Sequence, residues 1–325
     1  MDFAKRIGAA RRESIFNPDP QHIYVWCGTC VHGGDGRYYL YYSFWPRELG
    51  FSGWVIHSQI GVAAGDSPTG PFEPVGMAVP ASGRGWDADC THNPTAHIFD
   101  GRYYIYYMGN HGNGEYWNHR NNQRIGVAVS DSPTGPFERF DAPLIDVTPG
   151  GCDALMTSNP SVARMADGRY IMVYKAVGLT GALPQGGPVV CAVAFADSPI
   201  GPFVKCPDPI FSNPEHSWSV EDPFIWRENG RLYALVKDFQ GYFTHSARNC
   251  VALFESDDGV NWRAGDAPLA FERTIRWDDG KAQQVHNLER PQLLIEGGVP
   301  IALYCVCAPY DDYRESFNIS FAITG

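Results

Sequence analysis

One pattern recurs five times along the chain and limits the folds that the chain can adopt. Each copy has two apolar runs joined by a turn such as Asp-Gly or Asn-Gly, which supplies the positive φ angles of a two-residue β-hairpin turn. The copies lie at 35–42, 100–107, 167–174 and 229–233, with a weaker one at 297–304. Five hairpins of one design indicate a repeat protein built from β-strands.

A second motif alternates with the hairpins. A sequence of the form Asp-Ser-Pro-Xaa-Gly-Pro-Phe begins at Asp66, Asp131 and Asp197, and a degenerate copy has its aspartate at Asp257. A spacing of roughly 60 to 66 residues, with Gly and Pro turns, is typical of a propeller rather than a helical solenoid. We therefore predict an all-β fold, a five-bladed β-propeller of four-stranded antiparallel blades, whose closed ring leaves only short strand edges.

The two ends of the chain are expected to complete this ring. We predict one domain over residues 1–325, with residues 1–14 as a short helical extension outside the ring. The run 316–324 is predicted to be a strand of the last blade, or to pair with residues near the N-terminus. No linker or change in composition indicates a second domain.

Composition excludes several classes of function. The net charge of −11 disfavours nucleic acid and anionic membranes as partners, because both require a basic surface. No apolar run approaches the roughly 18 residues of a membrane span. The N-terminal residues lack the apolar region of a secretory signal, and nine cysteines fit reduced thiols, so a cytoplasmic protein is expected.

Polar residues stand at the heads of the predicted innermost strands. In a propeller these heads converge on the axis, where polar groups need partners or water, so a water-filled funnel is expected. Strand alternation predicts that the first residue of each pair points to one side and the second to the other. Aligned on their turns, the pairs are Cys27-Gly28, His92-Asn93, Ser158-Asn159, Glu221-Asp222 and Glu289-Arg290.

The hairpins, the strand heads and the repeated Pro-Phe turns resemble the five-bladed β-propeller glycoside hydrolases related to families 43, 117 and 32. The resemblance covers nearly the whole chain and implies that the Glu-Xaa-Pro of blade four, here Glu221, supplies the general acid. It also implies an aspartate base on blade one and a second aspartate on blade three. This chain has Cys27-Gly28 and Ser158-Asn159 at those places, so a divergent member is expected.

Hydrolysis of a glycosidic bond needs two carboxyl groups, one protonated and one ionised. Glu221 is predicted to be the acid, because neighbouring carboxylates would raise its pKa. Glu289 is the leading candidate for the second carboxylate. Asp153 and Asp87 are the alternates, since each lies in a loop at the same distance before an Asn-Pro head.

The predicted function is an exo-acting glycoside hydrolase on a plant or algal oligosaccharide, with loops 44–60 and 108–124 enclosing the funnel. No cofactor or metal ligand set is predicted, although the resemblance allows a structural cation on the axis. A non-catalytic carbohydrate-binding propeller and a phosphorylase or transferase remain the alternatives. The predicted substrate-binding residues are His92, Asn93, Asn159, Asp222, Trp86, Trp218, Arg290 and His286.

Overall fold

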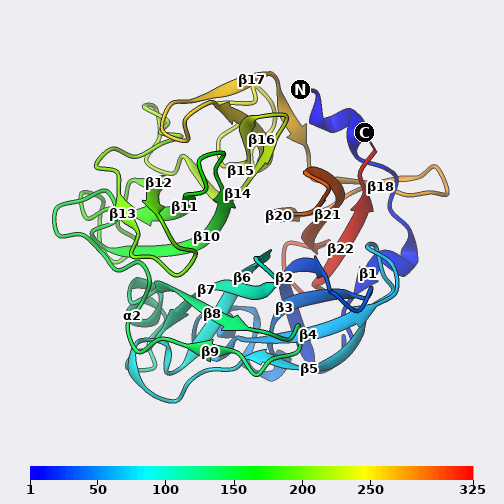
Figure 1. The fold of residues 1–325 in the computed structure, drawn as a ribbon, viewed down its shortest axis with the longest axis horizontal. Helices are drawn as coiled ribbons and strands as arrows, with labels where there is room; N and C mark the ends of the chain where they lie inside the picture. Colours follow the sequence, from blue (N-terminus) through cyan, green and yellow to red (C-terminus); the bar gives the residue numbers. More distant parts are fainter. Residues whose placement is uncertain (325) are drawn as a thin grey trace.

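The computed structural model describes residues 1–324, and they form five four-stranded antiparallel sheets arranged around a central axis (Figure 1). The predicted five-bladed propeller is therefore confirmed. Blade 1 holds β2 (Ile23–His32), β3 (Tyr38–Pro46), β4 (Gln59–Gly65) and β5 (Glu73–Val79). Blade 2 holds β6 (Cys90–Phe99), β7 (Arg102–Asn110), β8 (Arg124–Ser130) and β9 (Glu138–Arg139).

The other three blades repeat this order, with the innermost strand first. Blade 3 holds β10 (Met156–Arg164), β11 (Tyr170–Val177), β12 (Val189–Ala196) and β13 (Val204–Lys205). Blade 4 holds β14 (Val220–Glu228), β15 (Arg231–Asp238), β16 (Cys250–Ser256) and β17 (Trp262–Phe271). Blade 5 holds β20 (Asn287–Glu296), β21 (Val299–Ala308), β22 (Phe317–Ala322) and β1 (Ile15–Phe16).

Short elements lie outside the blades. The strands β18 (Thr274–Arg276) and β19 (Ala282–Gln284) form a separate hairpin. The α-helices are α1 (Trp54–His57) and α2 (Tyr116–Asn121), both in loops that follow the second strand of a blade. The 3-10 helices are η1 (Phe3–Arg6), η2 (Arg12–Ser14), η3 (Arg47–Leu49), η4 (Phe51–Gly53) and η5 (Gly85–Asp87). None of the helices in residues 1–324 is long and apolar enough to cross a membrane.

Two-residue turns form at the Asp-Gly of blade 2 and the Asn-Gly of blade 4 as expected, but blades 1 and 3 have the longer loops 33–37 and 165–169 instead. In the turn between β6 and β7, Asp100 and Gly101 both have positive φ angles, 51° and 81°, and Asn229 and Gly230 repeat this between β14 and β15. A turn with two positive φ angles matches the twist of the flanking strands, which is why Asp-Gly and Asn-Gly fix the hairpin register.

The ring is closed by pairing the two ends of the chain. Ile15 and Phe16 of β1 pair with Ile319 and Asn318 of β22, so the N-terminal strand is the outermost strand of the last blade. The prediction that 316–324 contributes a strand to the last blade and pairs near the N-terminus is confirmed for β22.

Residues 1–14 do not form the single helix that we expected. They contain two 3-10 turns, and they are packed onto the ring because Phe3 is fully buried against Trp226 of blade 4. Arg6 adds an ion pair to Glu228 at 3.0 Å.

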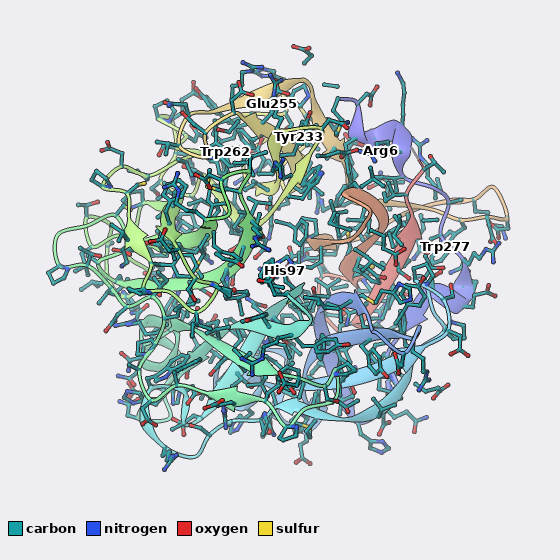
Figure 2. The ribbon with its side chains drawn as sticks, viewed as in Figure 1. Arg6, His97, Tyr233, Glu255, Trp262 and Trp277 are labelled. Atoms are coloured by element: carbon teal, nitrogen blue, oxygen red, sulfur yellow. The ribbon has the colours of Figure 1, made fainter. Side chains whose placement is uncertain are left out.

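The core lies between neighbouring blades, whose facing side chains fill the ring (Figure 2). His97 lies near the middle of that view, and its ring stacks with those of Phe99 and Phe224. The packed blades thus hold their strand heads in fixed positions around the axis.

Candidate active site

Every innermost strand has a bulge at its head, and this bulge shapes the site. The five residues at the bulges have φ angles between 50° and 58°, a region that non-glycine residues seldom adopt. Strand pairing is interrupted at the same point in each blade. The five bulge residues are Cys27, Asn93, Asn159, Asp222 and Arg290.

The bulges correct two expectations from the sequence. Regular alternation was wrong, because Glu221 and Asp222 both line one cavity instead of pointing to opposite sides. The alignment of blade 1 was also wrong by one residue. The bulge falls on Cys27, so Trp26 stands where the other blades have His92 and Glu221.

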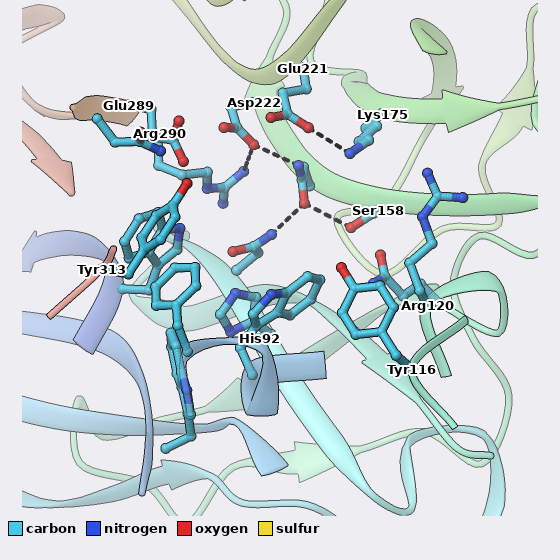
Figure 3. Close-up of a pocket in the computed structure, with 18 of the residues that line it drawn as sticks. His92, Tyr116, Arg120, Ser158, Lys175, Glu221, Asp222, Glu289, Arg290 and Tyr313 are labelled. Atoms are coloured by element: carbon cyan, nitrogen blue, oxygen red, sulfur yellow. Dashed lines mark hydrogen bonds and ion pairs between the residues drawn. The ribbon is translucent and has the colours of Figure 1, made fainter. Parts of the chain in front are cut away.

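The bulge residues are joined to one another around the axis. Cys27 Sγ donates to Asn93 Oδ1 at 2.6 Å, and Asn93 Nδ2 donates to Asn159 Oδ1 at 2.5 Å. Asn159 Nδ2 then donates to Asp222 Oδ1 at 2.6 Å, which also accepts from an Arg290 NH group at 3.3 Å. One side chain from each blade thus forms a hydrogen-bonded arc around the axis. Figure 3 draws the bonds of this arc that join Asp222 to its neighbours.

A cavity of about 230 Å³ opens above this arc. As expected, loops 44–60 and 108–124 contribute to its wall. Aromatic rings dominate the wall, and such rings suit the apolar faces of sugars. The aromatic residues that line the cavity are Trp26, Trp45, Phe51, Trp54, Tyr116, Trp117, Trp218 and Tyr313.

Two carboxylates in the cavity share one ammonium group. Lys237 Nζ lies 2.9 Å from Glu221 Oε1 and 2.6 Å from Glu289 Oε2. Lys175 from blade 3 holds the other oxygen of Glu221 at 2.6 Å. Glu221 is therefore paired with two cations, whereas Glu289 is paired with one.

These contacts set the ionisation of the site. Burial by itself would raise the pKa of Glu221, but Lys175 and Lys237 outweigh it and hold that pKa well below its usual range. For Asp222, burial and the nearby Glu221 carboxylate raise the pKa, and Arg290 offsets only part of this increase. The pKa values of these two adjacent carboxyl groups are thus separated, with that of Glu221 lowered and that of Asp222 raised.

His92 forms part of the wall as a neutral side chain. Burial and the Arg290 charge lower its pKa well below the usual value, and its Nδ1 lies 2.7 Å from Ser58 Oγ. Its ring stacks on Trp54 at 4.9 Å between centroids.

Most of the residues expected from the sequence come together here, and four do not. The residues that the structure brings into the cavity lining are Glu221, Glu289, Asp222, Arg290, His92, Asn93, Asn159 and Trp218. Asp87, Asp153, Trp86 and His286 are not among the residues that line it.

Asp87 and Asp153 hold their blades together instead. Asp153 is buried, accepts from Tyr174 OH at 3.0 Å and pairs with the Lys205 ammonium at 2.5 Å. Asp87 repeats this arrangement one blade earlier with a tyrosine hydroxyl and an arginine. The matching offset before Asn-Pro therefore reflects a repeated structural contact and not two loops above the funnel.

Trp86 and His286 also lie elsewhere. The Trp86 ring stacks on Tyr107 at 5.6 Å, between β7 and the loop before β6. His286 is half-buried beside Tyr313, with 5.5 Å between their ring centroids. Neither side chain lines the cavity.

Sequence reasoning missed the lysines. In the strand pairing, Lys175 lies opposite Ser158 on the neighbouring strand of blade 3, and Lys237 lies opposite Glu221 at the same position in blade 4. Extending each predicted hairpin back from its turn would have placed both lysines opposite the strand heads. Arg120 and Gln123, from the loop that contains α2, also line the cavity, although neither is among the site residues predicted from the sequence.

The axial residues do not fit the structural cation that the resemblance allowed. The buried Arg290 guanidinium already places a positive charge at the arc, and a second cation there would be repelled. In residues 1–324 there is also no group of three or more His, Cys, Asp or Glu side chains suited to a metal ion.

Comparison with known proteins agrees with the fold. No family model matches the sequence. A β-xylosidase from Xylanibacter ruminicola is 29% identical over 166 residues. The match covers 45% of this chain and 44% of that protein, which is less than half of its length.

Two solved structures have the same architecture along nearly the whole chain. A family 117 glycoside hydrolase from the marine bacterium Zobellia galactanivorans superposes with a TM-score of 0.66 at 17% identity, covering 98% of this chain and 89% of the other. A family 43 β-xylosidase/α-arabinofuranosidase from a compost metagenome, in complex with xylotriose, superposes with a TM-score of 0.65 at 17% identity. The superposition covers 98% of this chain and 94% of the other. In fold, this chain is a five-bladed β-propeller of the kind found in the glycoside hydrolases of families 43 and 117.

Proposed function

We propose that the protein is a glycoside hydrolase that acts on a short oligosaccharide, with Glu221 and Glu289 as its pair of carboxyl groups. The main support is the Lys237 ammonium, which contacts both side chains on the floor of a cavity walled by aromatic rings. The match to a β-xylosidase supports a glycoside as the substrate.

The roles of the two carboxyl groups follow from their partners. Glu221 is held ionised by two ammonium groups, so it is suited to be the nucleophile or base and not the acid that the sequence predicted. Glu289 has one ammonium partner, and we assign it as the acid. It would protonate the oxygen of the leaving sugar.

We propose that the reaction retains the configuration of the sugar. The shared contact with Lys237 holds one oxygen of each carboxylate near the same nitrogen, which is compatible with the roughly 5–5.5 Å separation of retaining enzymes. In this scheme Glu221 attacks the anomeric carbon as the leaving oxygen receives the Glu289 proton, and water then releases the sugar from Glu221.

The size of the cavity supports exo action. Its volume of about 230 Å³ is below the roughly 300–1,000 Å³ of typical small-molecule pockets. Phe51 and Tyr313 stack across its side at 4.0 Å, so the wall is continuous between loops of blades 1 and 5. A pocket of this size suits the end of a chain.

Two variants test the assignment. Glu221→Gln should lower kcat by roughly 10³-fold or more on every substrate, because no ionised carboxylate remains to attack or to activate water. Glu289→Gln should lower kcat by roughly 10²–10⁴-fold on natural oligosaccharides, but much less on dinitrophenyl glycosides, whose leaving group needs no proton. The measurement is initial rate on neutral and acidic aryl glycosides and on plant and algal oligosaccharides.

A matched control is Glu138→Gln, an exposed glutamate on β9, which should retain wild-type rates. Near-normal activity of Glu221→Gln would refute its role. Binding of sugars without release from any substrate of the panel would identify the protein as a non-catalytic carbohydrate-binding propeller.

A further inference from the structure

Arg120 carries a buried charge that has no acidic partner. Its side chain is only 6% exposed, and it lines the cavity from α2. One of its NH groups donates to Gln185 O at 2.8 Å and to Asn121 Oδ1 at 2.9 Å, both neutral acceptors. Among residues 1–324 it forms no ion pair, and burial lowers its pKa. A buried guanidinium without a carboxylate is costly, so this position favours an anion from outside the chain.

A second donor beside Arg120 also lacks a partner. Gln123, on the same segment, is 2% exposed and lines the same cavity. Its Nε2 is buried and has no hydrogen-bond partner among the described residues. Buried donors in proteins are almost always satisfied, so an unpaired one at a cavity indicates that a ligand accepts from it.

With Arg120 included, the cavity has one more cation than it has carboxyl groups. Lys175 lines the cavity, and Figure 3 draws it on the same side as Arg120 in that view. The Glu221 carboxylate is near enough to Arg120 to act on its pKa. Four cations at the cavity or directly behind it, Arg120, Lys175, Lys237 and Arg290, outnumber the three carboxyl groups, Glu221, Asp222 and Glu289.

We propose that Arg120, with Gln123 and Lys175, forms an oxyanion subsite beside Glu221 and that it binds the carboxylate of an acidic sugar in the substrate. The subsite gives a cavity in a protein of net charge −11 a local attraction for anions. Trp117 borders the guanidinium at 5.8 Å from its ring centroid, so the bound group has an aromatic surface next to its charge. A sugar ring can stack on that surface, whereas free phosphate cannot.

This inference deepens the proposed function by naming the class of substrate, and binding tests it without turnover. With the Glu221→Gln protein, calorimetry measures the affinity for methyl glycosides of glucuronic and galacturonic acid, for their methyl esters and for the neutral glucosides and galactosides. We expect an acidic glycoside to bind roughly tenfold to hundredfold more tightly than its ester and its neutral counterpart, the range for a hydrogen bond to a charged group.

Substitution then assigns the preference to the subsite. In the same background Arg120→Gln should abolish the preference, and Arg120→Lys should retain part of it. Arg102→Gln, a half-exposed arginine paired with Asp131 on the outside of blade 2, should leave it unchanged. Circular dichroism establishes that each variant is folded. The comparison of acid with ester needs no variant and stands if Arg120→Gln does not fold.

Three outcomes would overturn the proposal. Acidic and neutral glycosides could bind equally, or Arg120→Gln could leave the acidic preference intact. Inorganic phosphate could instead bind in an Arg120-dependent way and yield a sugar phosphate from the wild-type protein, which assigns the subsite to phosphate. Arg120-dependent binding of acidic sugars without hydrolysis by the wild-type protein refutes the hydrolase and leaves the subsite standing.

Discussion

Glu221 shows how neighbouring blades decide the chemistry of one residue. The glutamate is on blade 4, one of its ammonium partners is on the same blade, and the other, Lys175, is on blade 3. Burial alone would favour a protonated carboxyl group, and only the two lysines reverse this. The ionised state of Glu221 is thus a property of the assembled ring.

Removing one lysine tests this interpretation. Lys175→Met should raise the pKa of Glu221, because burial then has only Lys237 to oppose it. Since Glu221 acts in its ionised form, the acid limb of kcat/KM should move to higher pH, by about one unit or more. The measurement is the pH–rate profile, with the exposed Lys281→Met as the control. An unchanged acid limb would contradict the assigned role.

His92 predicts a pH dependence of stability. Its pKa in the folded protein lies well below the ordinary value of 6.5, so the unfolded chain binds the proton more readily. Its neutral form therefore supports the fold above pH 6.5, and this contribution is lost as the pH falls from 6.5 towards the folded pKa. When the pH is lowered from 8 to 4.5, the melting temperature of His92→Gln should fall less than that of the wild type. Parallel curves would rule out this role.

At the scale of the element, the loops before β6 and β10 are held by the same set of side-chain contacts. In each, a buried aspartate accepts from a tyrosine hydroxyl of the blade and pairs with a cation of the outermost strand. Asp153 does this with Tyr174 and Lys205. These contacts link the loop, the second strand and the outer strand of the blade. They therefore help to hold an outer strand of only two residues against its blade.

Asp153→Asn should therefore affect stability and leave catalysis intact. Breaking a buried ion pair is strongly destabilising, and because Lys205 is partly exposed we expect a loss of about 2–3 kcal/mol in the free energy of unfolding. Chemical denaturation and kcat would be measured together, with the exposed Asp131→Asn as the control. A large fall in kcat without a fall in stability would return Asp153 to the candidates for catalysis.

At the scale of the whole molecule, ring closure depends on a two-residue strand. Phe16 of β1 is buried where blade 5 meets blade 1, and its ring lies 4.7 Å from that of Tyr42 and 6.5 Å from that of Phe72. The first and last blades are thus joined by both backbone pairing and aromatic packing. Because the cavity draws residues from all five blades, its geometry requires a closed ring.

Phe16→Ala should weaken that closure. Truncating a buried phenylalanine costs roughly 3–5 kcal/mol, and at this edge position we expect a loss of about 3 kcal/mol in the free energy of unfolding. Phe140→Ala, at a 43% exposed phenylalanine, should change it by less than about 0.5 kcal/mol. Equal effects of the two variants would show that β1 does not secure the ring.

The sequence by itself determined the hairpins, the number of blades and the residues at four of the five strand heads. These follow from local rules: turn chemistry fixes each hairpin, and repetition of one unit fixes the ring. The same repetition places Glu221, Glu289 and Arg290 at the strand heads.

Only the tertiary structure decided the ionisation and the lining of the site. The bulges that turn Glu221 and Asp222 into one cavity break the alternation on which sequence reasoning relied. Lys175 reaches Glu221 across 46 positions of the chain, and Arg120 enters the cavity from the loop that contains α2. Contacts between distant segments set pKa values and pocket shape, and no local pattern in the sequence records them.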